Sequence, residues 1–276
     1  MSMGRAEGQC NTRDDIAGAF HQPRGEMGMN LEAGAELSWA WFPTSPLQPT
    51  TYLAMRHFEE ELDELRRRLL EMSGLVESSI YRAVSALVNR DESQITLVLQ
   101  NESRINQMEI EIDDAATGLL VLEQPVASDL RFITSAIKIN SDLERMGDAA
   151  VRIAERAVSL MHEPALQNLV DVAHMAGLAQ EMVRKCLDAF VKRDSALARS
   201  VLLSDDAVDD QRDANYEKLV EYMEQHPNTV RPCMSLFAVV RGLERIADHA
   251  TNIAEDVLFL VEGVDVRHHA EVRKEG

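Results

Sequence analysis

A fourteen-residue phrase occurs twice in this 276-residue chain, and it constrains the fold more than any other feature. Residues 142–155 read DLERMGDAAVRIAE and residues 242–255 read GLERIADHATNIAE, with eight of the fourteen paired positions identical. Upstream, 86–106 aligns with 189–209 without a gap and shares an Arg-Asp pair. A repeat unit of roughly a hundred residues is about the size of a small domain. We therefore expect two copies of one domain, side by side.

Helical periodicity fills the chain from residue 55 onwards. Apolar residues recur at spacings of three and four between 58 and 88, which predicts one long amphipathic helix. Alternating strand patterns are absent from the sequence. The expected helix starts are marked by capping acids and by prolines at first turns: Asp91, Asp194, Pro125 and Pro227. The sequence predicts an all-α fold of two tandem, sequence-related three-helix bundles with six long antiparallel helices.

The expected domain boundaries follow from this periodicity. We place the first three-helix bundle at 55–163, the second at 164–263 and a C-terminal tail at 264–276. Residues 1–54 are rich in Gly, Pro, Gln and Thr and lack apolar periodicity, so we expect a disordered or loosely attached leader. Either Met55 is the natural start of the protein, or the leader is a real, poorly ordered extension.

The composition excludes several classes of function. A net charge of -19 argues against a nucleic-acid surface and suits cations or basic protein partners. Prolines interrupt the longest uncharged run, 37–55, so we expect no membrane span. The cysteines Cys10, Cys186 and Cys233 form no Cys-x-x-Cys pair and are typical of reduced thiols in a cytoplasmic protein. The sequence contains no glycine-rich phosphate loop and no arrangement that suggests nucleophilic catalysis.

Each repeated phrase carries two acids four residues apart. These are Glu144 and Asp148 in the first copy, and Glu244 and Asp248 in the second. Residues at this spacing share one helix face, where bare like charges are unfavourable by roughly 0.2–0.5 kcal/mol. Arg145 and Arg245 point about 100° away around the helix and neutralise the pairs only in part, so we expect another group between the two carboxylates of each pair.

Hairpin geometry suggests further oxygen ligands on the neighbouring helix. A turn near residue 124 would place Glu102 and Asn106 opposite the first acidic pair, and a turn near 226 would place Asp205 and Asp209 opposite the second. Such clusters suit a divalent or trivalent cation with oxygen ligands. The alternative is a set of solvated carboxylates paired with lysine and arginine, but the repetition in register favours a metal.

Three segments resemble the PhoU family of phosphate-transport accessory and phosphate-signalling proteins: QPVASDLRFI (124–133), SDLERMGDAAVRIAE (141–155) and GLERIADHATNIAE (242–255). The resemblance covers about 55–262. It implies two three-helix bundles that bind metal ions through the Glu-x-x-x-Asp motifs. It also implies a cytoplasmic negative regulator of phosphate uptake and phosphate-starvation signalling. Members of the family are thought to connect the ATPase of a phosphate transporter to a sensor histidine kinase.

The resemblance also assigns roles to individual residues. It adds Asn252 to the second metal site, whereas Arg152 at the equivalent place in the first copy would compete with a metal for Asp148. We therefore expect the second copy to bind metal more tightly. Iron and zinc are the expected ions, and a homodimer is the expected assembly. Asp129 and Arg131 occur only in the first copy and are candidate partner contacts, although an acid in a first helical turn also has a structural use.

A second hypothesis is a metal-storing or di-iron carboxylate bundle. Ferritin-like sites use Glu-x-x-His pairs on two helices. No Glu-x-x-His occurs in the chain. This absence favours a regulator that is not an enzyme.

Overall fold

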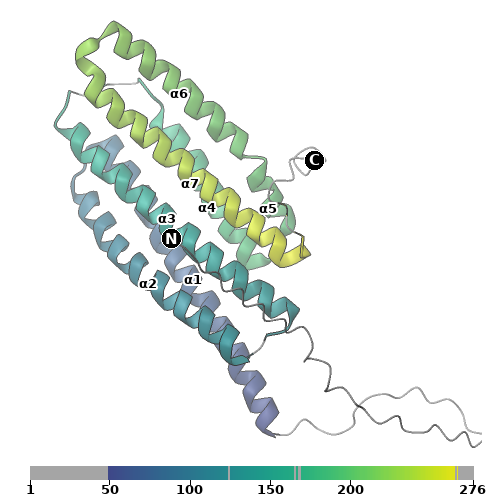
Figure 1. The fold of residues 1–276 in the computed structure, drawn as a ribbon. Coiled ribbons are helices and arrows are strands. Elements are labelled where there is room, and N and C mark those ends of the chain that lie inside the picture. Colours follow the sequence, from purple (N-terminus) through teal and green to yellow (C-terminus); the bar gives the residue numbers. More distant parts are fainter. Residues whose placement is uncertain (1–48, 124, 165, 167–168, 265, 267–276) are drawn as a thin grey trace, which may run out of the picture. The chain divides into compact units, whose positions relative to one another are not determined.

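The computed structural model describes residues 49–123, 125–164, 166, 169–264 and 266, and this part of the chain is helical with no strand in it (Figure 1). The first copy consists of α1 (Pro49–Asn89), α2 (Ser93–Glu123) and α3 (Ala127–Met161). The second consists of α4 (Val172–Lys192), α5 (Ser195–Leu202), α6 (Asp205–Gln225), a 3-10 turn η1 (Pro227–Thr229) and α7 (Val230–Glu262). The predicted all-α fold of two tandem three-helix bundles is confirmed. Residues 1–48 of the expected leader, and nearly all of the expected tail, lie outside the described residues.

Helix α1 shows why the periodicity predicts the fold. Its buried apolar residues recur at spacings of three and four and are at most 1% exposed: Leu65, Leu69, Met72, Val76 and Ile80. They form a single stripe that packs against α2 and α3. The helix begins at Pro49, earlier than the expected start at residue 55.

The repeated Arg-Asp pair builds the same turn in both copies. Arg90 and Arg193 adopt left-handed backbone conformations, with φ of 53° and 51°. Asp91 then accepts a hydrogen bond from the Ser93 N–H at 3.0 Å, and Asp194 accepts one from Leu197 at 2.9 Å. The arginine ends one helix and the aspartate caps the next, so both expected caps are confirmed.

The structure corrects two expected helix boundaries. The middle helix of the second copy is broken into α5 and α6, because Ser204 N–H turns back to the Val201 carbonyl at 2.9 Å. Asp205 and Asp206 then occupy a new first turn, where acids suit the helix dipole. Pro125 lies before α3 rather than in its first turn, since Val126 is the N-cap and α3 begins at Ala127.

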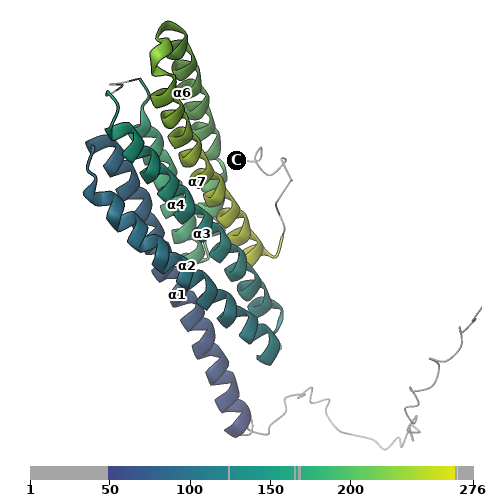
Figure 2. The ribbon, with the colours of Figure 1, turned by 60° about the vertical axis from the view of Figure 1, so that its left-hand side comes forward.

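The two bundles meet along α3 and α7, which run side by side (Figures 1 and 2). Helix α1 packs on α3 and also contacts α4, which in turn packs on α7. The seam is asymmetric although the copies are related. His249 Nδ1 lies 2.9 Å from Asp142 Oδ1 across the α3–α7 seam. The equivalent positions in the other copy are Ala149 and Gly242, and there the helix backbones approach closely.

None of the helices in the described part of the chain combines the length and the apolar character that a membrane span requires.

Candidate functional site

Three acids of the second copy lie within electrostatic reach of Asp248. Glu244 and Asp248 lie on α7, and Asp205 and Asp209 lie on α6, as the hairpin register predicts. Burial and the three neighbouring carboxylates raise the pKa of Asp248 to about 6. Asp248 nevertheless remains in contact with solvent. This cluster concentrates negative charge at one place on the α6–α7 hairpin.

An arginine lies within this cluster, contrary to expectation. Arg212 Nη1 is 2.8 Å from Asp209 Oδ1 and 3.0 Å from Glu244 Oε1, and its Nε is 2.9 Å from Asp213 Oδ1. The hydrogen bonds to Asp213 and Glu244 raise the pKa of the guanidinium. The second copy is expected to bind metal more tightly because only the first has a competing arginine, Arg152, and that reason is wrong, since Arg212 occupies the second pair. The sequence signal was present, because Arg212 follows Asp209 by three residues on the same helix face.

In the first copy, Arg152 acts as the sequence predicts. Its Nη2 lies 3.0 Å from Asp148 Oδ2. Burial, Asp148 and then Glu109 raise the pKa of Glu144. Both repeated pairs thus contain one carboxylate of raised pKa and have a guanidinium bound to the other.

The acid that faces Glu144 across the α2–α3 hairpin is Glu109. Asn140 Nδ2 donates to the Glu109 carbonyl and to Asp113 Oδ1, each at 2.9 Å, which sets the register between α2 and α3. Glu109 is the acid of α2 whose charge helps to raise the pKa of Glu144. Within the described residues, Glu102 and Asn106 have no hydrogen bond or ion pair.

Asn252 bonds to α3. Its Nδ2 lies 3.3 Å from Asp142 Oδ1, the same oxygen that His249 Nδ1 approaches. The amide and the imidazole therefore take part in the polar seam between the two bundles. In this arrangement Asn252 donates its N–H to Asp142 and is not grouped with the acids of α6.

The two candidate partner contacts have different surroundings. Asp129 lies half-buried in the first turn of α3, where its charge suits the helix dipole. Arg131 is half-buried beside Gly263, the C-cap of α7, and its Nε has no hydrogen-bond partner among the described atoms. A guanidinium at the C-terminal end of a helix is electrostatically favourable.

The donor chemistry of the acidic clusters suits a hard cation, since carboxylate oxygens are the ligands that such ions prefer. Across the ranges that the structure describes, no three acidic, histidine or cysteine side chains are grouped closely enough to hold a metal ion. The guanidinium groups of Arg212 and Arg152 already supply positive charge to the two pairs. A metal would have to displace them.

Comparison with known proteins agrees with the duplicated helical architecture. The family model for the PhoU domain matches residues 69–157 and again 172–257. A "Phosphate-specific transport system accessory protein PhoU homolog" of Pseudomonas aeruginosa is 42% identical over 79% of this chain and 90% of its own length. The accessory protein PhoU of Serratia marcescens is 34% identical over 76% of this chain and 87% of its own length.

Two crystal structures have the same fold. PhoU from Pseudomonas aeruginosa superposes with a TM-score of 0.73 at 41% identity, covering 75% of this chain and 100% of that structure. The phosphate transport system regulatory protein PhoU from Streptococcus pneumoniae superposes with a TM-score of 0.70 at 29% identity, covering 76% of this chain and 99% of that structure. From the duplicated domain, the shared fold and these relatives, the chain belongs to the PhoU family.

Proposed function

We propose that this protein is a regulatory accessory protein of a phosphate transport system and is not an enzyme. The observation that carries the proposal is the similarity, across both repeats, to proteins named as phosphate-specific transport system accessory proteins. The acidic pairs support it, because an arginine holds one carboxylate of each pair. Such surfaces suit binding better than covalent chemistry.

The finer proposal names the partner proteins and states that the regulation is negative. The protein restrains phosphate uptake and phosphate-starvation signalling by linking the ATPase of a phosphate transporter to a sensor histidine kinase. It acts in the cytoplasm, reaches the inner membrane only through these partners, and functions as a homodimer. Its net charge of -19 supports basic contact surfaces on the partners.

A metal ion, with iron or zinc as the expected ions, is proposed for the acidic clusters. In the second copy, Arg212 would leave Asp209 and Glu244, and their oxygens would become ligands together with Asp248. The charges of Glu244, Asp205 and Asp209 act on Asp248, which favours a cation there. We therefore still expect the second copy to bind metal more tightly than the first, even though it must displace an arginine.

Deletion of the chromosomal gene tests the regulatory proposal. Alkaline phosphatase activity and transporter expression should rise in phosphate-rich medium, because the restraint is lost. Reintroducing the wild-type gene should restore repression. Unchanged expression in the deletion strain would overturn the regulatory proposal.

The same strains test the metal as a regulatory element. A Glu244→Ala/Asp248→Ala variant should derepress the phosphate-starvation genes more than a Glu144→Ala/Asp148→Ala variant, with both proteins present at wild-type levels and folded. Equal repression by both variants would contradict a regulatory role for the metal.

A metal-storing bundle is the second candidate function, favoured by the presence of an acidic cluster in both copies. It predicts many ions per chain and normal phosphate regulation in the deletion strain. Elemental analysis of the purified protein, set beside the expression measurements, distinguishes storage from regulation.

A further inference from the structure

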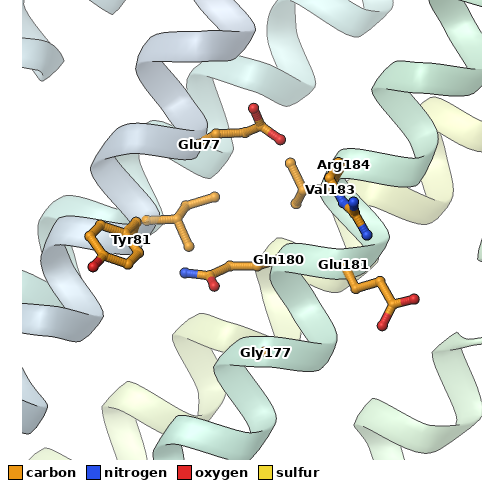
Figure 3. A pocket seen from close by; sticks show the side chains of 8 residues that line it. Glu77, Tyr81, Gly177, Gln180, Glu181, Val183 and Arg184 are labelled. Carbon is orange, nitrogen blue, oxygen red and sulfur yellow. The ribbon is translucent and has the colours of Figure 1, made fainter.

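A pocket of about 460 Å³ lies between α1 and α4, where the first helices of the two repeats meet (Figure 3). This volume is within the range of about 300–1,000 Å³ that is typical of ligand sites. Neither the acidic clusters nor the α3–α7 seam contributes to it. It is lined by Glu77, Ile80 and Tyr81 of α1 and by Gly177, Gln180, Glu181, Val183 and Arg184 of α4.

The pocket has an apolar floor and an aromatic rim. Ile80 and Val183 are buried at 0% and 1% exposure, whereas Tyr81 at the rim is 66% exposed. Gly177 leaves one wall open, because a Cβ built on it would meet no atom within 4 Å. A side chain with an aliphatic part and a polar end fits this pocket, because its base is apolar and its rim is exposed to solvent.

Two opposite charges, Glu77 and Arg184, line the pocket and act on each other electrostatically. Burial raises the pKa of Glu77, while the nearby Arg184 acts in the opposite direction. In the part of the chain that the structure describes, neither side chain has a hydrogen bond or an ion pair. Glu181 differs, because Lys185 Nζ lies 2.8 Å from its Oε1. A half-buried carboxylate without a donor is costly, so Glu77 favours an incoming cation.

Exposed apolar side chains flank the pocket along both helices. Leu70 precedes Glu77 by seven residues, Val88 follows Tyr81 by seven, and Val191 follows Arg184 by seven; all three are exposed. Residues seven apart lie on one face of a helix. These apolar side chains lie two turns from the pocket, farther than a small molecule reaches, and their heptad spacing matches the apolar anchors of an amphipathic helix that binds in a groove.

We propose that the α1–α4 groove binds an amphipathic helix of a partner protein, with an arginine of that helix in the pocket against Glu77. A guanidinium can donate two parallel hydrogen bonds to this carboxylate and stack on Tyr81. An acidic residue one turn away on the same helix would meet Arg184. The net charge of -19 favours a partner whose surface is basic. This site is independent of the acidic clusters and of the phosphate role.

Selection of helical peptides on the intact protein tests the proposal directly. A displayed library of randomised 18-residue helical peptides is enriched for binding to the wild-type chain. Enriched peptides should carry one arginine, an Asp or Glu three or four residues from it, and apolar residues at heptad spacing. Their affinity should fall at least about tenfold on Glu77→Gln, which removes the charge and keeps the shape.

A second variant fills the pocket with a larger side chain, and a matched control makes the same substitution at a glycine outside it. Gly177→Leu fills the open wall and should abolish binding, whereas Gly118→Leu, at another helical glycine with nothing within 4 Å of its Cβ, should leave binding unchanged. Both substitutions raise helix propensity, so circular dichroism should show folded proteins. A charge-reversed groove, Glu77→Arg with Arg184→Glu, should select peptides with the two charges exchanged.

Several outcomes would overturn the proposal. These are a failure to enrich peptides, enrichment of peptides without a basic residue, and binding that survives both Glu77→Gln and Gly177→Leu. Sedimentation of the free protein tests the other possible occupant of the groove, a second copy of this chain. If Gly177→Leu dissociates a dimer that Gly118→Leu leaves intact, a second copy of the chain occupies the groove and the partner helix does not.

Discussion

At the residue scale, arginines supply the positive charge for the acidic pairs. In the first copy Arg152 holds Asp148, and in the second Arg212 bridges Asp209 and Glu244. The Arg212 side chain is only 23% exposed, compared with 51% for Arg152, so it is the more firmly held of the two. A cation that binds either pair competes with a guanidinium for the same carboxylate oxygens.

Replacing Arg212 should therefore increase metal binding in the second copy. We expect Arg212→Gln to hold more metal than the wild type after loading with iron or zinc salts and desalting, because Asp209 and Glu244 are released. Inductively coupled plasma mass spectrometry measures the bound metal. Arg156→Gln, at an exposed arginine, is the control and should match the wild type. Less metal in Arg212→Gln would show that the arginine supports the site and does not compete with the ion.

At the element scale, short polar side chains decide where the helices start and stop. Asp91 accepts hydrogen bonds from the Ser93 backbone N–H at 3.0 Å and the Ser93 hydroxyl at 2.6 Å, and Gln94 donates to its other oxygen. The hydrogen bonds from the Ser93 and Gln94 side chains, and then from the Ser93 backbone, lower the pKa of Asp91. The charged carboxylate is thus the form that caps α2.

The cap should make stability depend on pH below about 4. A carboxyl whose pKa is lowered in the folded state stabilises it above the unfolded value and loses that effect as pH falls. Asp91→Ala should therefore lower the melting temperature at pH 7 and have a smaller effect near pH 3. Thermal unfolding followed by circular dichroism measures the difference. Glu92→Ala, at the exposed neighbour, is the control, and an Asp91 effect of equal size at both pH values would refute the charged cap.

At the scale of the whole described molecule, the α3–α7 seam joins the two repeats. It combines the Asp142–His249 contact with a close approach at Gly242, where a Cβ would lie 2.9 Å from Cγ1 of Ile153. Lys138 Nζ also reaches Asp256 Oδ1 at 2.8 Å. The two copies therefore pack as partners across a seam whose two halves differ in chemistry.

Glycine-to-alanine substitutions inside and outside the seam should distinguish the effect of tight packing on stability from the effect of helix propensity. Gly242→Ala should lower the free energy of unfolding by about 1–2 kcal/mol, because overpacking against the buried Ile153 outweighs the gain in propensity. Gly118→Ala, where the new Cβ meets no atom within 4 Å, should raise it by about 0.5–1 kcal/mol. Urea denaturation measures both changes. Equal stabilisation by the two substitutions would show that the seam tolerates the extra methyl group.

The sequence by itself determined the number, type and order of the main helices. Spacings of three and four along α1, and the repeated Arg-Asp turn, are local properties that do not depend on what the helix packs against. The duplication also predicted the paired acids and the register that brings Asp205 and Asp209 to Asp248. These residues could be placed because a short antiparallel hairpin leaves few alternatives.

Only the tertiary structure decided which groups meet across helices. Arg212 and Glu244 lie on the two helices of one hairpin. Several acids lie near Arg212 in the sequence, and only the packed structure shows that its long side chain reaches Glu244. Asn252 bonds to Asp142 because α7 packs against α3, a contact between the repeats that no local pattern encodes. A helix face is fixed by its own sequence, whereas its neighbour is chosen by the packing of the whole chain.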